Sequence, residues 1–182
     1  ANYEGNWNFW NYVNTDSRRQ VSFDTFLGGG SSEFGPHFFD INPGVTYRPI
    51  SSLSVRGGMR FNLFDHDAQW VTNAEVAGAP THYVFARLDQ QTVALTTRVN
   101  YTMSPTLSLQ IYAEPFVSAG AYTGYKELVD GRAEDWQSRY APYDYRGNAD
   151  FNYRSFRTTN VLRWEYRPGS SLFVVWQQGR ED

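Results

Sequence analysis

The sequence has no cysteine, only one lysine among its 16 basic residues, and no long apolar run. Without cysteine the chain has no disulfide framework, no cysteine zinc site and no thiol nucleophile. The longest unbroken apolar stretch is Leu172–Trp176, far short of the roughly 18 residues that a transmembrane helix requires. The missing apolar run does not exclude transmembrane β-strands, because the alternating apolar and polar residues of such strands average out as polar.

Charge is scarce as well. Charged residues make up only 19% of the 182 residues, whereas aromatic residues make up 18%. That aromatic content is too high for a disordered chain, and the length suffices for one compact domain or for part of a larger one. The net charge of −3 and the pI near 5.6 give no electrostatic reason to bind nucleic acid, so no such partner is predicted.

Apolar and polar residues alternate along most of the chain. Between Leu53 and Leu63 the odd positions are apolar or glycine, and the even positions are serine, arginine, glycine or asparagine. The same period recurs in segments 21–27, 39–47, 93–103, 107–114 and 156–167. A period of two is typical of β-strands with unlike faces, and helical spacing fits none of these segments. The sequence therefore predicts an all-β fold.

A short internal repeat marks the joints between predicted strands. In each copy a tyrosine ends one apolar face, a turn of small residues and proline follows, and a leucine opens the next face. The copies are Tyr47–Leu53, Tyr101–Leu107 and Tyr166–Leu172. Further turn sequences give turns near residues 17, 50, 78 and 105, about 30 residues apart. This spacing predicts an antiparallel up-and-down meander of about ten strands, with its tight turns at one end.

Longer connections are predicted at the opposite end. Gly28–Pro36 has the composition of a flexible loop, and Asp65–Asp67 that of a polar tip. The longest excursion, about 118–153, exceeds an ordinary connector, so we expect a functional or surface-exposed loop. Either a helical turn or an extra hairpin fits its sequence.

Two architectures fit the alternation: a soluble β-sandwich with its apolar face packed inward, and an outer-membrane barrel with that face against lipid. The run from Leu53 to Leu63 rises ~33 Å, or ~25 Å at a tilt of ~40°, which matches the apolar belt of a barrel. Tyr47, Tyr101 and Tyr166 stand where an aromatic girdle would lie at the membrane interface. We therefore predict that residues 1–182 form a single transmembrane β-barrel domain or a segment of a larger barrel.

Arginine recurs on the predicted polar faces, where the outside of a soluble sheet would carry more lysine, threonine and glutamate. The residues predicted to face the lumen are Arg48, Arg56, Arg60, Arg98, Glu114, Arg157, Arg163, Glu165 and Arg167. In one interpretation these side chains brace the wall or hold a plug through contacts with carboxylates and tyrosines. In the other they give the lumen a cationic lining that favours anionic or sugar-like solutes.

No catalytic motif is recognisable. His37, His66 and His82 lie in different segments, each in a predicted loop or at a strand end, and no nucleophile motif accompanies them. A divalent-cation site at Asp65–Asp67 is an alternative to a solvated tip, and the tip is favoured. The sequence therefore predicts no enzymatic activity, no cofactor and no metal site.

Five stretches of the chain resemble a known family. They are Trp7–Asn11, Val45–Pro49, Tyr83–Gln90, Asn100–Phe116 and Val161–Ser171, of which Asn100–Phe116 and Val161–Ser171 are the most specific. They resemble the C-terminal barrel region, a domain of unknown function, of large bacterial surface proteins with an N-terminal family 9-like carbohydrate-binding module. The resemblance implies a place in the bacterial outer membrane, and it carries over no catalytic residues.

Members of that family are several times longer and continue to a closing strand, whereas this sequence ends at Gly179–Asp182. The resemblance thus implies a segment of a bigger barrel. Expected partners are the lipid bilayer, additional strands from the same longer protein or a neighbouring chain, and carbohydrate. The expected function is a pore, a translocation conduit or a membrane anchor for the surface carbohydrate-binding module. The alternatives are a soluble all-β carbohydrate-binding module and, third, an outer-membrane hydrolase.

Overall fold

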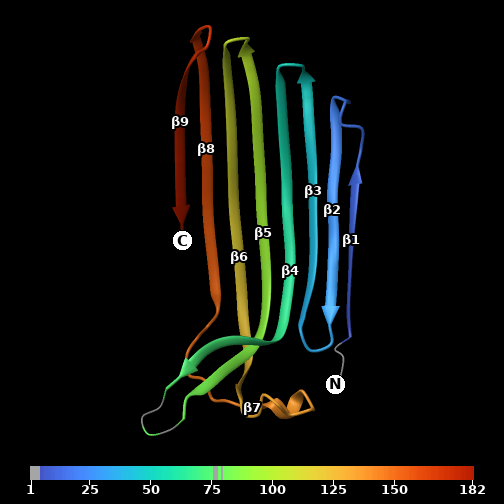
Figure 1. Ribbon diagram of the computed structural model, residues 1–182, viewed down its shortest axis with the longest axis vertical. Helices are drawn as coiled ribbons and strands as arrows, with labels where there is room; N and C mark the ends of the chain where they lie inside the picture. The colour runs from blue at the N-terminus through green and yellow to red at the C-terminus, as the bar shows by residue number, and fades with distance from the viewer. Residues whose placement is uncertain (1–4, 76–77, 79) are drawn as a thin grey trace.

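The computed structural model describes residues 5–75, 78 and 80–182, and these form one antiparallel sheet without a second layer (Figure 1). The strands are β1 (Asn6–Asn14), β2 (Val21–Ser32), β3 (Pro36–Ile50), β4 (Leu53–Ala74), β5 (His82–Ser104), β6 (Leu107–Leu128), β7 (Tyr140–Pro142), β8 (Phe151–Arg167) and β9 (Ser170–Glu181). Sequence neighbours are sheet neighbours, except that both β7 and β8 pair with β6. The predicted all-β meander is confirmed, with nine strands in place of about ten. Within the described ranges, no helix is both long and apolar enough to cross a membrane.

Four tight connections gather at one end of the sheet. They follow β1, β3, β5 and β8, and in the last of them Gly169 adopts the left-handed φ of 77° that favours glycine (Figure 1). The connections after β2, β4 and β6 lie at the opposite end. The prediction that the turn near residue 78 belongs with the tight turns was wrong, because β4 and β5 have 22 and 23 residues. Part of that predicted turn, 77–80, lies outside the described residues.

The predicted loop at Gly28–Pro36 is largely strand. Gly28–Gly30 belong to β2, and only residues 33–35 connect β2 to β3. Glycine runs suggest flexibility, but here aromatic rings occupy the space beside the backbone. A Cβ atom at Gly28 would meet the Phe26 ring at 2.7 Å, and one at Gly30 would meet the Phe38 ring at 2.7 Å. The missing side chains make room for these rings.

Two other predicted loops are also shorter than expected. Asp65–Asp67 lies inside β4 and is no tip, because β4 continues to Ala74. The excursion 118–153 shrinks to 129–150, since β6 and β8 take up its two ends. The sequence fitted either a helical turn or an extra hairpin in that connection. The structure has a 3-10 turn at Gln137–Arg139 and also the short strand β7, which pairs with β6.

The two faces of the sheet differ in polarity. Directly paired residues of antiparallel strands share a face, so the register defines two sets. One set, the apolar face, includes Val55 opposite Val99, and the other, the polar face, includes Arg56 opposite Arg98. The alternation of the sequence therefore separates apolar from polar side chains across the whole width of the sheet.

Burial shows how the sheet curves. Ser22, Thr46, Thr92 and Ser118 are all buried, and all lie on the polar face. Large side chains of the apolar face stand exposed instead, as Leu95 does at 46%. In a single layer, burial confined to one face means that side chains crowd together there. The polar face is therefore concave and the apolar face convex, the reverse of a globular core.

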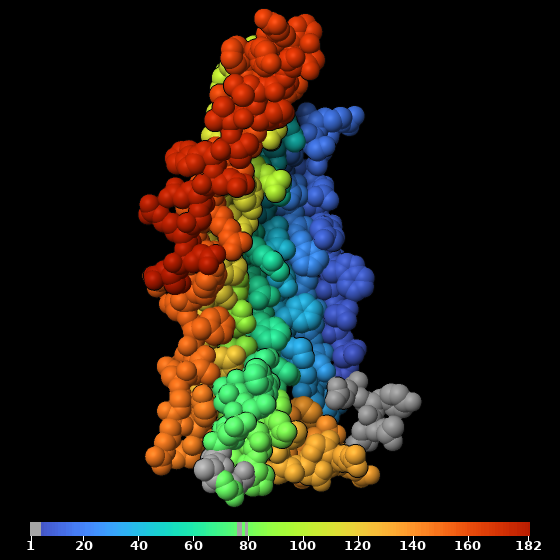
Figure 2. Space-filling model, turned by 60° about the vertical axis from the view of Figure 1, so that its left-hand side comes forward, coloured from blue at the N-terminus to red at the C-terminus, as the bar shows by residue number. Residues whose placement is uncertain are grey.

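The tight turns rise in steps across the sheet (Figures 1 and 2). Strand β5 continues three residues past Tyr101, which is the partner of Leu53 at the start of β4. The same overhang recurs in β3 past Tyr47 and in β8 past Trp164. Three residues rise ~10 Å, and two strands are ~9.6 Å wide, so the line of turns is inclined by ~45°. That inclination corresponds to the strand tilt of barrels.

The band of apolar residues on the convex face follows the same incline. It covers Trp7–Val13 in β1, Leu53–Leu63 in β4 and Leu172–Trp176 in β9. The register places Trp7 in the row of Asp65, just beyond the band in β4. It places Trp176 in the row of Val55, near the opposite edge. Both edges of the band are inclined in the same direction as the line of turns. When the strands tilt by that angle, the band therefore runs perpendicular to the axis of a barrel.

Beyond the band, at the loop end, the polarity of the faces reverses. Asp65 and Asp89 oppose each other on the convex side, and Arg87 reaches both carboxylates at 3.3 Å. On the other side of β5, Val84 and Ala86 are 0% exposed. This end of the sheet therefore keeps its apolar side chains inward and its charges outward.

The two edges of the sheet are open. Strands β1 and β9 do not pair with each other in the described part of the chain. Both edges also carry exposed apolar side chains on the polar face, namely Trp10 and Tyr12 in β1 and Phe173 and Val175 in β9. The edge strands are therefore apolar on both sides.

Candidate functional site

The concave polar face is the candidate site. The register places six predicted lumen residues on it: Arg56, Arg60, Arg98, Glu114, Arg157 and Arg163. Arg48 reaches the same face, since its Nη1 lies 3.5 Å from the hydroxyl of Ser22. Glu165 accepts from Arg163 at 3.3 Å. Arg167 stands beyond a register shift at the end of β8, opposite Ser170, apart from this group.

One ion pair spans three strands. The guanidinium of Arg56 in β4 crosses β3 and binds both carboxylate oxygens of Asp24 in β2, with Nη2 to Oδ2 at 2.6 Å. Gly44 of β3 lies underneath, where a Cβ atom would stand 2.5 Å from Arg56 Nη2. Only glycine leaves room for this crossing, so Gly44 serves the ion pair.

The other arginines also have partners on this face. The Arg98 guanidinium lies 5.0 Å from the centre of the Tyr112 ring, and the Tyr112 hydroxyl donates to Glu114. Arg157 donates to Glu181 at 3.0 Å. Glu114 thus binds a tyrosine, although the sequence suggested it as an arginine partner. The acids that do pair with arginines across strands were missed, because alternation gives the face of Asp24 or Glu181 but not the strand register.

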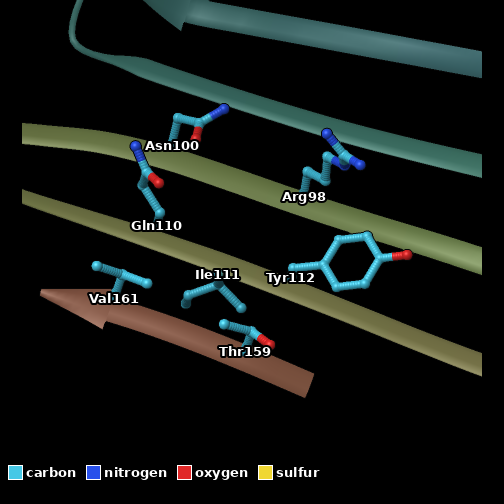
Figure 3. Close-up of a pocket in the computed structure, with 7 residues that line it drawn as sticks. All are labelled: Arg98, Asn100, Gln110, Ile111, Tyr112, Thr159 and Val161. Atoms are coloured by element: carbon cyan, nitrogen blue, oxygen red, sulfur yellow. The ribbon is translucent and has the colours of Figure 1, made fainter. Parts of the chain in front are cut away.

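Two hollows adjoin Arg98. In the first, of ≈340 Å³, Arg98 and Asn100 of β5 lie beside Tyr112 and Gln110 of β6, with Thr159 of β8 nearby (Figure 3). The second, of ≈460 Å³, lies between β3, β4 and β5. Arg98 stands between the two hollows, with a hydrogen-bonding surface on one side and further arginines on the other.

The three predicted girdle tyrosines lie at the tight-turn end. Tyr47 and Tyr101 are on the apolar face. Tyr47, Tyr101 and Tyr166 are 48%, 38% and 53% exposed. The Tyr166 ring lies 6.0 Å from that of Trp164. Each tyrosine is near the end of its strand, so the three follow the rising line of turns.

The three histidines do not share a site: His37 and His66 are near each other on paired strands but on opposite faces, since His37 lies opposite Asp65 and His66 opposite Pro36. His37 and His82 are near the starts of β3 and β5, as predicted, but His66 is inside β4 and not in a loop. His82 Nδ1 contacts a carboxylate oxygen of Glu127. Over the ranges that the structure describes, no three histidine, aspartate or glutamate residues come together as a metal site.

An aromatic and charged cluster occupies the loop end. Lys126 Nζ donates to Asp67 Oδ2 at 2.7 Å and lies 4.9 Å from the centre of the Tyr140 ring. The Tyr140 ring contacts Trp136, which stacks on Phe34 from the β2–β3 connection. The 129–150 connection is thereby held against Lys126 of β6 and against the β2–β3 turn, which lies far from it in sequence.

The Asp67–Lys126 contact predicts a pH dependence. The hydrogen bond from Lys126 holds the pKa of Asp67 below its usual value of 3.8. Because the folded-state pKa is lowered, the contact stabilises the loop end above the usual pKa, and this stabilisation is lost as the pH falls through the lowered value. In Lys126→Gln, NMR titration of the Asp67 carboxyl should show a pKa raised toward the usual value. Asp16, whose pKa is lowered by Arg18, is the control and should not change; an unaltered Asp67 titration would contradict the assignment.

Comparison with known proteins gives a family. The whole chain, residues 1–182, matches the profile of a domain of unknown function, DUF5916. No curated protein and no solved structure matches it. The match supports the resemblance to a domain of unknown function, and it brings no link to a membrane or to a carbohydrate-binding module.

Proposed function

We propose that this chain, which belongs to the DUF5916 family, is part of the wall of an outer-membrane β-barrel that acts as a pore, a translocation conduit or a membrane anchor. The observation that carries the proposal is the inclined apolar band on the convex face. Its height, from Leu53 to Leu63 in β4, corresponds to ~23 Å at the ~45° inclination of the turns, close to the ~25 Å apolar belt of such barrels. Lipid covers such a band without any further protein layer.

Lipid suits this face better than a second sheet does. A packed second sheet would cover the apolar face with side chains that interdigitate with it, and it would give no reason for aromatic residues to mark the ends of that face. Here the band climbs with the turns, aromatic residues mark its edges at Trp7, Tyr47 and Tyr101, and charge begins just beyond it at Asp65. Aromatic residues at both boundaries and charge outside them are typical of a membrane-spanning strand.

The proposal gives the sheet an orientation. Short turns of such barrels lie on the periplasmic side and long loops on the outside of the cell. The tight turns after β1, β3, β5 and β8 would then be periplasmic, and the 129–150 connection would be extracellular. The concave polar face, with Arg56, Arg60 and Arg98, would line the lumen.

The open edges require further strands. Unpaired backbone N–H and C=O groups are not tolerated in lipid, and β1 and β9 each expose one edge. We propose that strands from the same longer protein, or from a neighbouring chain, complete the barrel. Anchoring of a carbohydrate-binding module is the part of the proposal that rests on the resemblance in sequence. No catalytic step is assigned.

Two tryptophans of similar exposure test the membrane position. Trp164 is on the apolar face within the band and is 49% exposed, whereas Trp70 lies beyond the band in β4 and is 53% exposed. In the intact protein reconstituted in vesicles, variants that keep one of these two tryptophans are examined with brominated lipid. Fluorescence of Trp164 should be strongly quenched and that of Trp70 should not. Equal quenching, or a protein that stays monodisperse in buffer without detergent, would favour the soluble alternative.

A further inference from the structure

We propose that the concave face binds an oxyanion in the hollow between β3, β4 and β5. The inference deepens the proposed function and rests on it, because a water-filled lumen would bring solutes to this hollow. The hollow measures ≈460 Å³, and its polar lining consists of Asn42, Arg56, Arg60, Thr96 and Arg98. Three arginines and no carboxylate line it.

The arginines differ in how far their charge is neutralised. Arg56 is fully engaged with Asp24. The side chain of Arg60 is 63% exposed, and its Nε lies 3.9 Å from Asp40 Oδ1, too far for a hydrogen bond. Arg98 forms no ion pair with a carboxylate of residues 5–75, 78 or 80–182, and its described partner is an aromatic ring. Arg60 and Arg98 therefore keep donors for a ligand.

The register places these groups around the same part of the polar face, which forms the floor of the hollow. Arg56 lies directly opposite Arg98, and Gly58 directly opposite Thr96, on neighbouring rows of the polar face. Like charges directly opposite each other on a sheet are destabilising. Asp24 already balances the charge of Arg56, so an anion in the hollow would balance chiefly Arg98 and Arg60, which have no hydrogen-bonded carboxylate among the described residues.

The floor of the hollow is open because residue 58 is a glycine. A Cβ atom at Gly58 would meet only the carbonyl oxygen of Pro43, at 3.7 Å, and φ is not positive there. Neither packing nor backbone conformation requires glycine at this position. Its missing side chain leaves the space between the arginines free.

The chemistry of the lining defines the ligand class. Guanidinium groups bind carboxylate and phosphate through paired N–H donors. The hollow lacks the acidic partners that would suit a cation. We therefore assign it to a small solute that carries a phosphate or carboxylate group, and the two sources of oxyanion are separated by experiment.

The test uses calorimetric titration of the intact, detergent-solubilised protein with inorganic phosphate in one arm and citrate in the other. At least one anion should bind saturably, and the tighter arm identifies the source. Gly58→Val fills the hollow and should weaken that binding at least tenfold. Gly57→Val is the matched control, because Gly57 lies on the opposite face and its Cβ atom would also stand in open space. It should leave the affinity within twofold.

A charge variant provides the second readout. Arg98→Gln should weaken binding at least tenfold, whereas Arg163→Gln, which removes an arginine paired with Glu165 elsewhere on the same face, should not. No saturable binding, or equal affinity in wild type and Gly58→Val, would overturn the inference. If binding is lost while quenching of Trp164 persists, the ligand assignment fails and the membrane wall stands. If Trp164 is not quenched while anion binding persists, the ligand assignment stands and the membrane wall fails.

Discussion

Replacing Leu95 with arginine should lower the free energy of unfolding by about 2–4 kcal/mol, because the side chain would enter lipid near the midplane. Leu95 lies on the apolar face opposite Met59, inside the band, and is 46% exposed. On a protein surface in water such an exposed leucine would tolerate arginine with little cost. The loss is therefore specific to a lipid-facing position, and denaturant unfolding of the intact protein in vesicles measures it.

The neighbouring residue is the control for this prediction. Thr96 is on the polar face opposite Gly58, so Thr96→Arg places the new charge on the concave side. Its effect should be well below that of Leu95→Arg. Comparable losses at both positions would remove the basis for assigning lipid to the convex face and water to the concave face.

The alternation of the sequence predicted the strands and the two faces. It did so because the side-chain period of a strand is independent of what lies beside it. Strand ends were harder to predict. Gly28–Gly30 have the composition of a loop, and only the register shows that the rings of Phe26 and Phe38 fill the space above them.

The ion pairs of the polar face could not be read from the sequence for a related reason. Alternation puts Asp24 and Arg56 on the same face, but their contact depends on the register of β2, β3 and β4 and on a glycine at Gly44. No local pattern encodes that three-strand alignment. The arginines were therefore found, while their partners were not.

The reversal of polarity at the loop end escaped prediction because it begins without any break in the period: Asp65 lies opposite Asp89 in unbroken register, and the even positions of β5 change from polar Thr92 to apolar Leu88. Strand β4 shifts register against β5 between His66 and Gln69 and again between Trp70 and Thr72. Each bulge adds a residue to β4, so its odd and even positions exchange faces at the first bulge and return to their original faces at the second. A pattern that is simple from Leu53 to Leu63 cannot be extended past such shifts.

That reversal leads to the largest expected effect, which is at Val84. This residue is 0% exposed and lies directly opposite Glu127 of β6. Val84→Asp would bury a carboxylate without a partner and place it opposite another acid, and both changes are destabilising. The expected loss is about 3–5 kcal/mol, the usual cost of an uncompensated buried charge.

The loss should be confined to the part of the sheet beyond the band, because that part packs by itself. Hydrogen exchange of the backbone amides from His82 to Asp89 measures its opening separately from unfolding of the band. Tyr83→Asp is the matched control, since Tyr83 precedes Val84 in the same strand and is 48% exposed. It should cost less than about 1 kcal/mol. Equal protection in the two variants would show that the inner side of β5 is not a core, and the reversal of polarity beyond the band would then be wrong.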